Sequence, residues 1–294
     1  KAIDDTIFYP SKAKERIKSM IETRPDWCVS RQRVWGVPLP IFVKKKSGEV
    51  LIDDDVFENI AKIFEKEGSD CWFSDDPQKF LGKKYKSDNY EKSKDIVEVW
   101  FDSGSTHSYV LEKRADLKWP ASMYLEGSDQ HRGWFHSSLL ESCGTRGRAP
   151  FETILSHGFV VDGKGQKMSK SVGNIIAPED ILKKYGADIL RVWVAASNYA
   201  EDLRIDHSIL EQHAEAYRKI RNTFRYLLGN LNDNFSEIDF KKVDLNNLPE
   251  LEQYLLHKIY LLNENFQKYF KSYSFHNLYK ELLNFCIVDL SAFY

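Results

Sequence analysis

The pattern of apolar residues changes partway along the 294-residue chain, and this change constrains the fold more than any other feature. Between residues 96 and 161, short apolar runs of strand length alternate with a helical pattern. We expect a strand over 123–125, a helix over 133–143 and a strand over 153–161. Strands that alternate with helices predict an α/β layer with a parallel sheet.

From about residue 178 the strand pattern disappears, and three long amphipathic helices are predicted instead. Apolar side chains recur at steps of three and four within 217–231, 251–266 and 275–285. A helical bundle should therefore follow the α/β part.

The N-terminal third is predicted to contain a short helix over 10–23 and an irregular loop over 24–36, which is dense in aromatic and cationic residues. Residues 37–94 differ in composition and read as a small inserted module. We expect a hairpin that pairs 41–43 with 50–52, then a helix near 56–66. Lysines and acidic residues dominate the rest of this module, so we predict no chemical role for it.

The charge balance and the cysteines exclude several classes of protein. Lys and Arg number 42 against 44 Asp and Glu, so the net charge of -2 excludes a uniformly basic nucleic-acid coat but not a local basic groove. The four cysteines are far apart (Cys28, Cys71, Cys143 and Cys286), which predicts neither a disulfide framework nor a zinc site. Isolated thiols and the lack of an apolar run of ~18 residues favour a cytoplasmic protein that does not enter a membrane.

The segment 162–171 carries the most specific pattern. Lys167 and Lys170 stand three residues apart in a glycine-flanked loop, with serines beside them, just after a predicted strand. Two cations and several hydroxyl donors in a mobile loop are suited to binding a polyanion such as a polyphosphate. The alternative is a solvated basic turn without a ligand.

A second candidate site lies where the strand near 123–125 ends and the next helix begins. Glu126, Asp129 and Gln130 can accept hydrogen bonds from ribose hydroxyls and an amino group, and Gly127 lets a ligand approach the backbone. The alternative is that Ser128 or Asp129 caps the helix.

Two further residues allow both a functional and a structural interpretation. Trp100, in an apolar strand that runs into a turn, either walls a pocket for a small apolar side chain or belongs to the core. His157, at the end of a predicted strand, either meets a nucleotide or caps the strand.

Taken together, these segments resemble isoleucyl-tRNA synthetases of class I. The resemblance extends over essentially the whole chain and rests on five segments in this order: 24–33, 100–104, 124–135, Lys-Met-Ser-Lys-Ser at 167–171, and Tyr-Gly-Ala-Asp at 185–188. Valyl and leucyl relatives share the lysine segment, whereas 125–135 looks specific to the isoleucyl branch.

The resemblance implies a fold and a division into domains. Residues 1–36 and 95–177 would form the second half of a Rossmann-like catalytic domain, with 37–94 as a small α+β insertion. Residues 178–294 would begin the helical domain that binds the tRNA anticodon. This implied architecture agrees with the α/β class that the pattern itself predicts.

The resemblance also implies an activity, in which ATP and isoleucine form isoleucyl-adenylate and the aminoacyl group moves to the 3′ end of its tRNA. Lys167 and Lys170 would be the catalytic residues that hold the phosphates, and Trp100 would line the isoleucine pocket. The adenylate would be bound by Glu126, Gly127, Asp129, Gln130, His157 and Lys170. Arg218, Arg221 and Arg225, on one helix face, are weaker candidates for tRNA contacts, with a solvated face as the alternative. ATP would bring Mg²⁺, zinc is not expected, and the complete protein would be a cytoplasmic monomer.

The sequence also departs from the family. The chain has no counterpart of the His-x-Gly-His signature, of a cysteine-rich zinc module or, apart from its exit near 1–9, of the inserted editing domain. We therefore expect the 294 residues alone to lack activity. The alternatives are a valyl-type synthetase, a related nucleotidyltransferase and a tRNA-binding module without catalysis.

Overall fold

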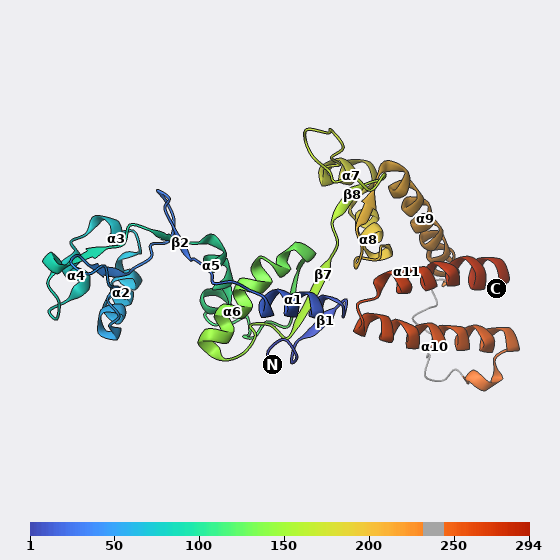
Figure 1. The fold of residues 1–294 in the computed structure, drawn as a ribbon. Coiled ribbons are helices and arrows are strands. Elements are labelled where there is room, and N and C mark those ends of the chain that lie inside the picture. Colours follow the sequence, from blue (N-terminus) through green and yellow to red (C-terminus); the bar gives the residue numbers. More distant parts are fainter. Residues whose placement is uncertain (232–243) are drawn as a thin grey trace. The chain divides into compact units, whose positions relative to one another are not determined.

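The computed structural model describes residues 1–231 and 244–294 (Figure 1). The chain divides into two compact units. Unit 1 comprises Lys1–Ile7, Lys12–Tyr124 and Asp129–Ile154, and unit 2 comprises Phe8–Ser11, Leu125–Ser128 and Leu155–Tyr294. Each unit is described by itself below.

The boundaries between the two units fall within or just after the strands of a single sheet. Its order is β1-β7-β6, with β1 at Ile7–Tyr9, β7 at Thr153–His157 and β6 at Tyr124–Gly127. Helix α6 (Trp134–Arg146) connects β6 to β7, and a parallel bridge joins Ala121 to Phe151 just ahead of these strands. This βαβ arrangement confirms the predicted α/β class with parallel strands.

In unit 1, helix α1 (Ala13–Glu22) follows β1, and helix α5 (Val99–Gly104) packs against α6. A π-helix, η2 (His107–Leu111), follows α5. The apolar segment that contains Trp100 was expected to be a strand, but only β5 (Ile96–Val97) is extended. The strand prediction is wrong from Val99 onward because the Glu98 carboxylate accepts a hydrogen bond from Trp100 N (3.1 Å) and caps a helix there.

The inserted module of unit 1 has a hydrophobic core of its own, made of Phe42, Val56, Ile60, Trp72, Phe80 and Leu81. Around this core lie β3 (Phe42–Lys44), α2 (Asp54–Glu67), α3 (Cys71–Ser74), α4 (Pro77–Leu81), η1 (Ser87–Asn89) and β4 (Tyr90–Lys92). The predicted hairpin is only partly correct, because Val50 forms a single bridge to Val43 while β3 takes β4 as its antiparallel partner. The pair β2 (Ser30–Arg31) and β5 joins the module to the rest of the unit.

Unit 2 contains a strand pair that the sequence analysis missed. Residues 153–161 do not form one strand, because β7 ends at His157 and β8 (Val160–Asp162) pairs in parallel with β9 (Leu203–Ile205). A Cβ at Gly158 would overlap the backbone of Glu201, so the chain can change partners only at a glycine. The expectation of no strand after residue 178 is therefore wrong at β9.

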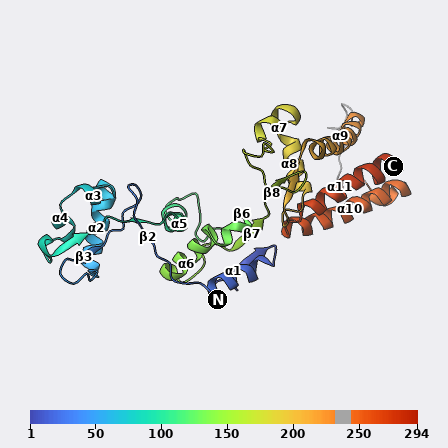
Figure 2. The same cartoon turned by 45° about the horizontal axis from the view of Figure 1, so that its top comes forward.

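The helices of unit 2 include the three predicted from the sequence. They are α9 (His207–Asn230), α10 (Glu250–Lys271) and α11 (Phe275–Asn284), and α11 continues as the π-helix η7 (Phe285–Phe293). Helices α10 and α11 run alongside each other in both views (Figures 1 and 2). Two shorter helices, α7 (Pro178–Tyr185) and α8 (Ala187–Ala196), and the 3-10 turn η6 (Leu245–Asn247) were not predicted.

The main core of unit 2 joins α7, α8, α9 and the strand pair. Its buried residues are Ile181, Ile189, Trp193, Leu203, Ile205, Leu210 and Ala214. Among the described residues, no helix is both long and apolar enough to cross a membrane.

Candidate active-site elements

The loop that follows β8, residues 162–174, is fixed at its base by two polar side chains; we call it the lysine loop. Asp162 accepts hydrogen bonds from Gln166 N (2.8 Å), Lys164 N (3.0 Å) and the Asn174 side-chain amide (2.9 Å). Asn174 Oδ1 in turn accepts a hydrogen bond from Ser169 N (2.9 Å). The Asn174 amide, followed by the backbone N–H of Gln166, lowers the pKa of the Asp162 carboxyl, so this carboxylate stays ionised and holds the loop at neutral pH.

The two lysines predicted to bind phosphates lie in this loop and are exposed. Met168, between them, packs against the core of unit 2, whereas neither Lys167 nor Lys170 forms an ion pair with any described residue. A Cβ at Gly163 would overlap the carboxylate of Asp206, which caps α9 through Ile209 N (2.8 Å). The loop is therefore anchored at several points while both ammonium groups remain available to a polyanion.

The predicted residues Glu126, Gly127 and His157 lie at the ends of neighbouring strands of the β1-β7-β6 sheet. Glu126 is exposed near the end of β6, and the adjacent Gly127 is buried. The half-buried His157 ends β7, and its Nδ1 donates to the carbonyl of Gly158 (2.7 Å). The ends of neighbouring strands are where open α/β sheets bind ligands, so the nucleotide-site prediction for these three residues stays a prediction.

Gln130 and Asp129, the other predicted adenylate residues, belong to unit 1. Gln130 Oε1 accepts a hydrogen bond from Trp134 N (2.9 Å) at the start of α6, and Gln130 Nε2 donates to Asp129 Oδ2 (2.9 Å). Gln130 therefore contacts the first backbone N–H of α6, where Ser128 or Asp129 was the alternative helix cap expected from the sequence.

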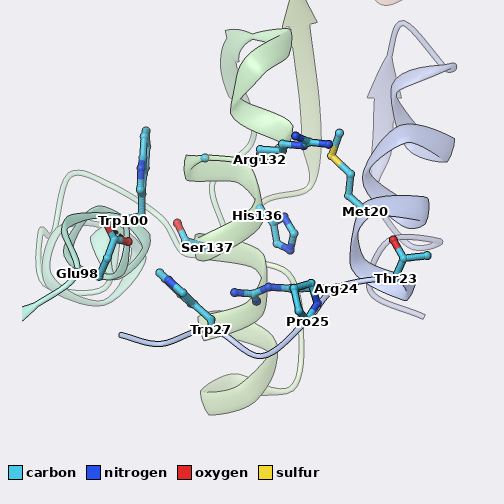
Figure 3. Close-up of a pocket in the computed structure, with 11 residues that line it drawn as sticks. Met20, Thr23, Arg24, Pro25, Trp27, Glu98, Trp100, Arg132, His136 and Ser137 are labelled. Carbon is cyan, nitrogen blue, oxygen red and sulfur yellow. Dashed lines mark hydrogen bonds between the residues drawn. The ribbon is translucent and has the colours of Figure 1, made fainter. Parts of the chain in front are cut away.

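A cleft of about 430 Å³ lies entirely within unit 1 (Figure 3). Its walls come from α1, the following loop, the start of α5 and the first turns of α6. The lining residues are Met20, Thr23, Arg24, Pro25, Trp27, Glu98, Trp100, Arg132, Gly133, His136 and Ser137. A cavity of this size is in the range that binds small molecules.

Trp100, predicted to wall a pocket, lines this cleft. Its side chain is 41% exposed, so it is not a buried core residue. A Cβ at Gly133 would approach the Trp100 ring to 3.0 Å, so a glycine is needed where the ring meets α6. Trp27, from the loop after α1, also lines the cleft, and its ring lies 6.1 Å from that of Phe101.

The cleft also contains three basic residues that the sequence analysis did not assign. Arg24 lies 5.0 Å from the centre of the Trp27 ring, and neither Arg24 nor Arg132 forms an ion pair with a described residue. Burial and, second, the charge of Arg24 lower the pKa of His136. For Arg24 the signal in the sequence was the density of cationic and aromatic residues in 24–36, and Arg132 lies in the segment 124–135 that carries part of the resemblance.

Half-buried carboxyl groups lie between α5 and α6. Burial, with a smaller contribution from the charge of Asp102, raises the pKa of Glu141 to about 7, although the hydrogen bond from Ser105 lowers it. Glu141 Oε2 accepts a hydrogen bond from the Ser105 hydroxyl (2.8 Å), while Oε1 is buried without a hydrogen-bond partner among the described residues. Burial and the charge of Glu98 raise the pKa of Asp102 as well.

On α9, Arg218, Arg221 and Arg225 are exposed and form no ion pair with a described residue. No cluster of three or more His, Cys, Asp or Glu side chains suited to a metal is found in the described part of the chain.

Comparison with solved structures identifies the fold. The chain aligns with a leucyl-tRNA synthetase of Agrobacterium radiobacter K84, solved with tRNA and LeuAMS, with a TM-score of 0.66 over 94% of this chain and 38% of that one, at 18% identity. It aligns with the methionyl-tRNA synthetase of Mycobacterium tuberculosis, solved with methionyl-adenylate, with a TM-score of 0.66 over 97% of this chain and 47% of that one, at 16% identity. The fold is therefore that of class I synthetases.

The sequence then identifies the family: residues 1–206 match the family described as tRNA synthetases class I (I, L, M and V), and the chain belongs to it. Over all 294 residues it is 80% identical to the isoleucine–tRNA ligase of Pelagibacter ubique, and over 294 aligned residues it is 52% identical to that of Zymomonas mobilis. The chain covers 32% and 31% of these two relatives, so it spans about a third of their length. The predicted resemblance to the isoleucyl branch is confirmed, and the valyl alternative is not favoured.

Proposed function

We propose that the complete protein is an isoleucine–tRNA ligase, which activates isoleucine with ATP and transfers it to the 3′ end of its tRNA. The observation that carries this proposal is the lysine loop: two exposed lysines, with no ion pair to any described residue, are held on either side of a half-buried methionine. The 80% identity to an isoleucine–tRNA ligase supports the choice of amino acid.

In the first step an oxygen of the isoleucine carboxylate attacks the α-phosphorus of ATP in line with the leaving group. A bond forms between that oxygen and phosphorus, the bond from phosphorus to the bridging oxygen breaks, and pyrophosphate leaves. No covalent enzyme intermediate is needed, so catalysis rests on positioning and on neutralising the charge of the pyrophosphate. Lys170, with Lys167, supplies that positive charge.

The remaining roles belong to residues at the strand ends and in the cleft. Glu126, Gly127, Asp129 and Gln130 hold the ribose and amino group of the adenylate, His157 lies near the adenine, and Trp100 contacts the isoleucine side chain. Mg²⁺ would accompany ATP, with phosphate oxygens as its ligands, and would neutralise part of their charge. In the second step a hydroxyl of the terminal ribose of tRNA attacks the isoleucyl carbonyl, and AMP leaves.

The exposed arginines Arg218, Arg221 and Arg225 support tRNA binding along α9 through phosphate contacts. We further propose that the complete protein acts as a cytoplasmic monomer, and that the domains follow the limits given in the sequence analysis.

The test is isoleucine-dependent pyrophosphate exchange by the complete protein carrying Lys170→Ala. We expect the rate to fall by about a hundredfold or more, since removing one transition-state charge contact costs ~3 kcal/mol. Lys164→Ala, which removes another exposed lysine of the same loop, is the matched control and should change the rate less than threefold. An unchanged rate in Lys170→Ala would refute the assigned role.

A further inference from the structure

The α1–α6 end of the cleft in unit 1 has an excess of positive charge that no described residue neutralises. Arg24 and Arg132 line it and have no ion pair. The one acidic residue in the lining, Glu98, uses its carboxylate to accept a hydrogen bond from Trp100 N at the start of α5. Arg24 is half-buried over the Trp27 ring, and a partly buried cation without a counter-ion favours an anionic ligand.

His136 adds a third polar group, and its geometry fits the same ligand. One of its ring nitrogens bonds to the backbone of His131, while Nε2 is buried without a hydrogen-bond partner among the described residues. Figure 3 draws the imidazole between the side chains of Arg132 and Arg24. The positive end of α6, which begins at Trp134, adds to the potential in this region.

Guanidinium groups and imidazolium rings bind oxyanions through short, charge-assisted hydrogen bonds. From the two guanidinium groups and the unpartnered imidazole nitrogen in one cleft, we infer that Arg24, Arg132 and His136 form a binding site for an oxyanion, either a phosphate-like group or a carboxylate. Trp27, under the Arg24 guanidinium at 5.0 Å, gives the site an aromatic wall. This site is separate from the lysine loop in the chain, and the inference does not rest on the proposed activity.

Binding at this site takes up a proton. In the free protein, burial and Arg24 lower the pKa of His136, so the ring is neutral at pH 7. A bound anion favours the protonated ring and raises this pKa. The charged groups that face His136 are Arg24 and Arg132, with Glu98 across the cleft. Anion affinity therefore rises as the pH falls from 8 to 6.

The experiment is calorimetric titration of the complete protein with sodium sulfate and, separately, sodium acetate, at pH 6.0 and 8.0 and constant ionic strength. Both anions keep the same charge over this range. The protein carries Lys167→Gln and Lys170→Gln so that the lysine loop does not contribute. We expect at least one anion to bind more tightly at pH 6.0 by severalfold. Tighter binding of sulfate assigns a phosphate-like ligand, and tighter binding of acetate assigns a carboxylate.

Variants then locate the binding. Arg24→Gln and Arg132→Gln should each weaken it about tenfold, since each removes a charge-assisted contact. His136→Gln should leave binding largely intact but abolish the difference between pH 6.0 and 8.0. The control is Arg16→Gln, which replaces an exposed arginine on α1 outside the cleft lining. It should change neither the anion affinity nor its pH dependence. The inference is overturned if neither anion binds, if both arginine variants bind as the parent does, or if His136→Gln keeps the pH dependence. Melting temperatures confirm that each variant is folded.

Discussion

The lysine loop and the α5–α6 helix pair place polar groups in opposite ways. In the loop, the backbone is fixed by Asp162 and Asn174 while both lysines are exposed and have no ion pair with a described residue. Between α5 and α6, the half-buried carboxyl groups of Glu141 and Asp102 are partly removed from water, and their pKa values are raised. The first arrangement presents charge to a ligand, and the second suppresses charge so that two helices can pack closely.

The largest stability effect should come from Gly104→Ala in the helix pair. A Cβ at this position would overlap the Glu141 carboxyl and lie 2.9 Å from Ser137 Oγ. Such overpacking costs about 1–3 kcal/mol. The control is Gly144→Ala on α6, where a Cβ meets nothing within 4 Å and alanine favours the helix. Urea denaturation of the complete protein should show a lower midpoint only for Gly104→Ala, and equal midpoints would contradict the packing described.

Glu141→Gln should remove a pH dependence of stability. The pKa of Glu141 is raised from 4.5 to about 7, so the folded state retains a proton that the unfolded state has lost between these values. Stability then falls as the pH rises through this window, by about 1.4 kcal/mol per pH unit, and is constant above it.

The measurement is the melting temperature of parent and variant between pH 5 and 8. The glutamine keeps an acceptor for Ser105, so the variant should lose less stability than the parent as the pH rises. Parallel curves would show that Glu141 does not titrate in this window.

The smallest of these effects is expected in the lysine loop. Asn174→Ala removes the hydrogen bonds to Ser169 N and Asp162, each worth about 1 kcal/mol, and should slow pyrophosphate exchange about tenfold. Because the loop is exposed, the melting temperature should hardly change. Val172→Ala, an exposed side chain in the same loop, is the control. A large loss of thermal stability in Asn174→Ala would mean that the loop is part of the core.

Much of the fold could be predicted because hydrophobic periodicity reports burial directly. The long helices α9 and α10 and the βαβ unit around α6 were found in this way. The helix α5 was missed because its apolar residues also fit a strand, and the Glu98 cap decided between the two. The pair β8–β9 depends on contacts between segments about 40 residues apart, which local patterns do not encode.

The candidate site was predictable to a similar extent. Lys167 and Lys170 stand in a short, specific string, and the strand-end residues follow from the strand and helix pattern. The cleft residues Arg24, Arg132 and His136 come from separate segments, so only the tertiary structure of unit 1 brings them into one cleft. Gln130 could be found in the sequence, but its role is harder to assign there. Its side chain is a predicted ligand contact and also accepts a hydrogen bond from the first residue of α6.

The most direct test of the central claim is pyrophosphate exchange by the complete protein, measured with isoleucine and valine side by side under the same conditions. We predict exchange with both ATP and isoleucine present and a kcat/KM for isoleucine at least fourfold above that for valine, since one buried methylene is worth ~0.8 kcal/mol. Equal or better use of valine, or no amino-acid-dependent exchange, would contradict the account.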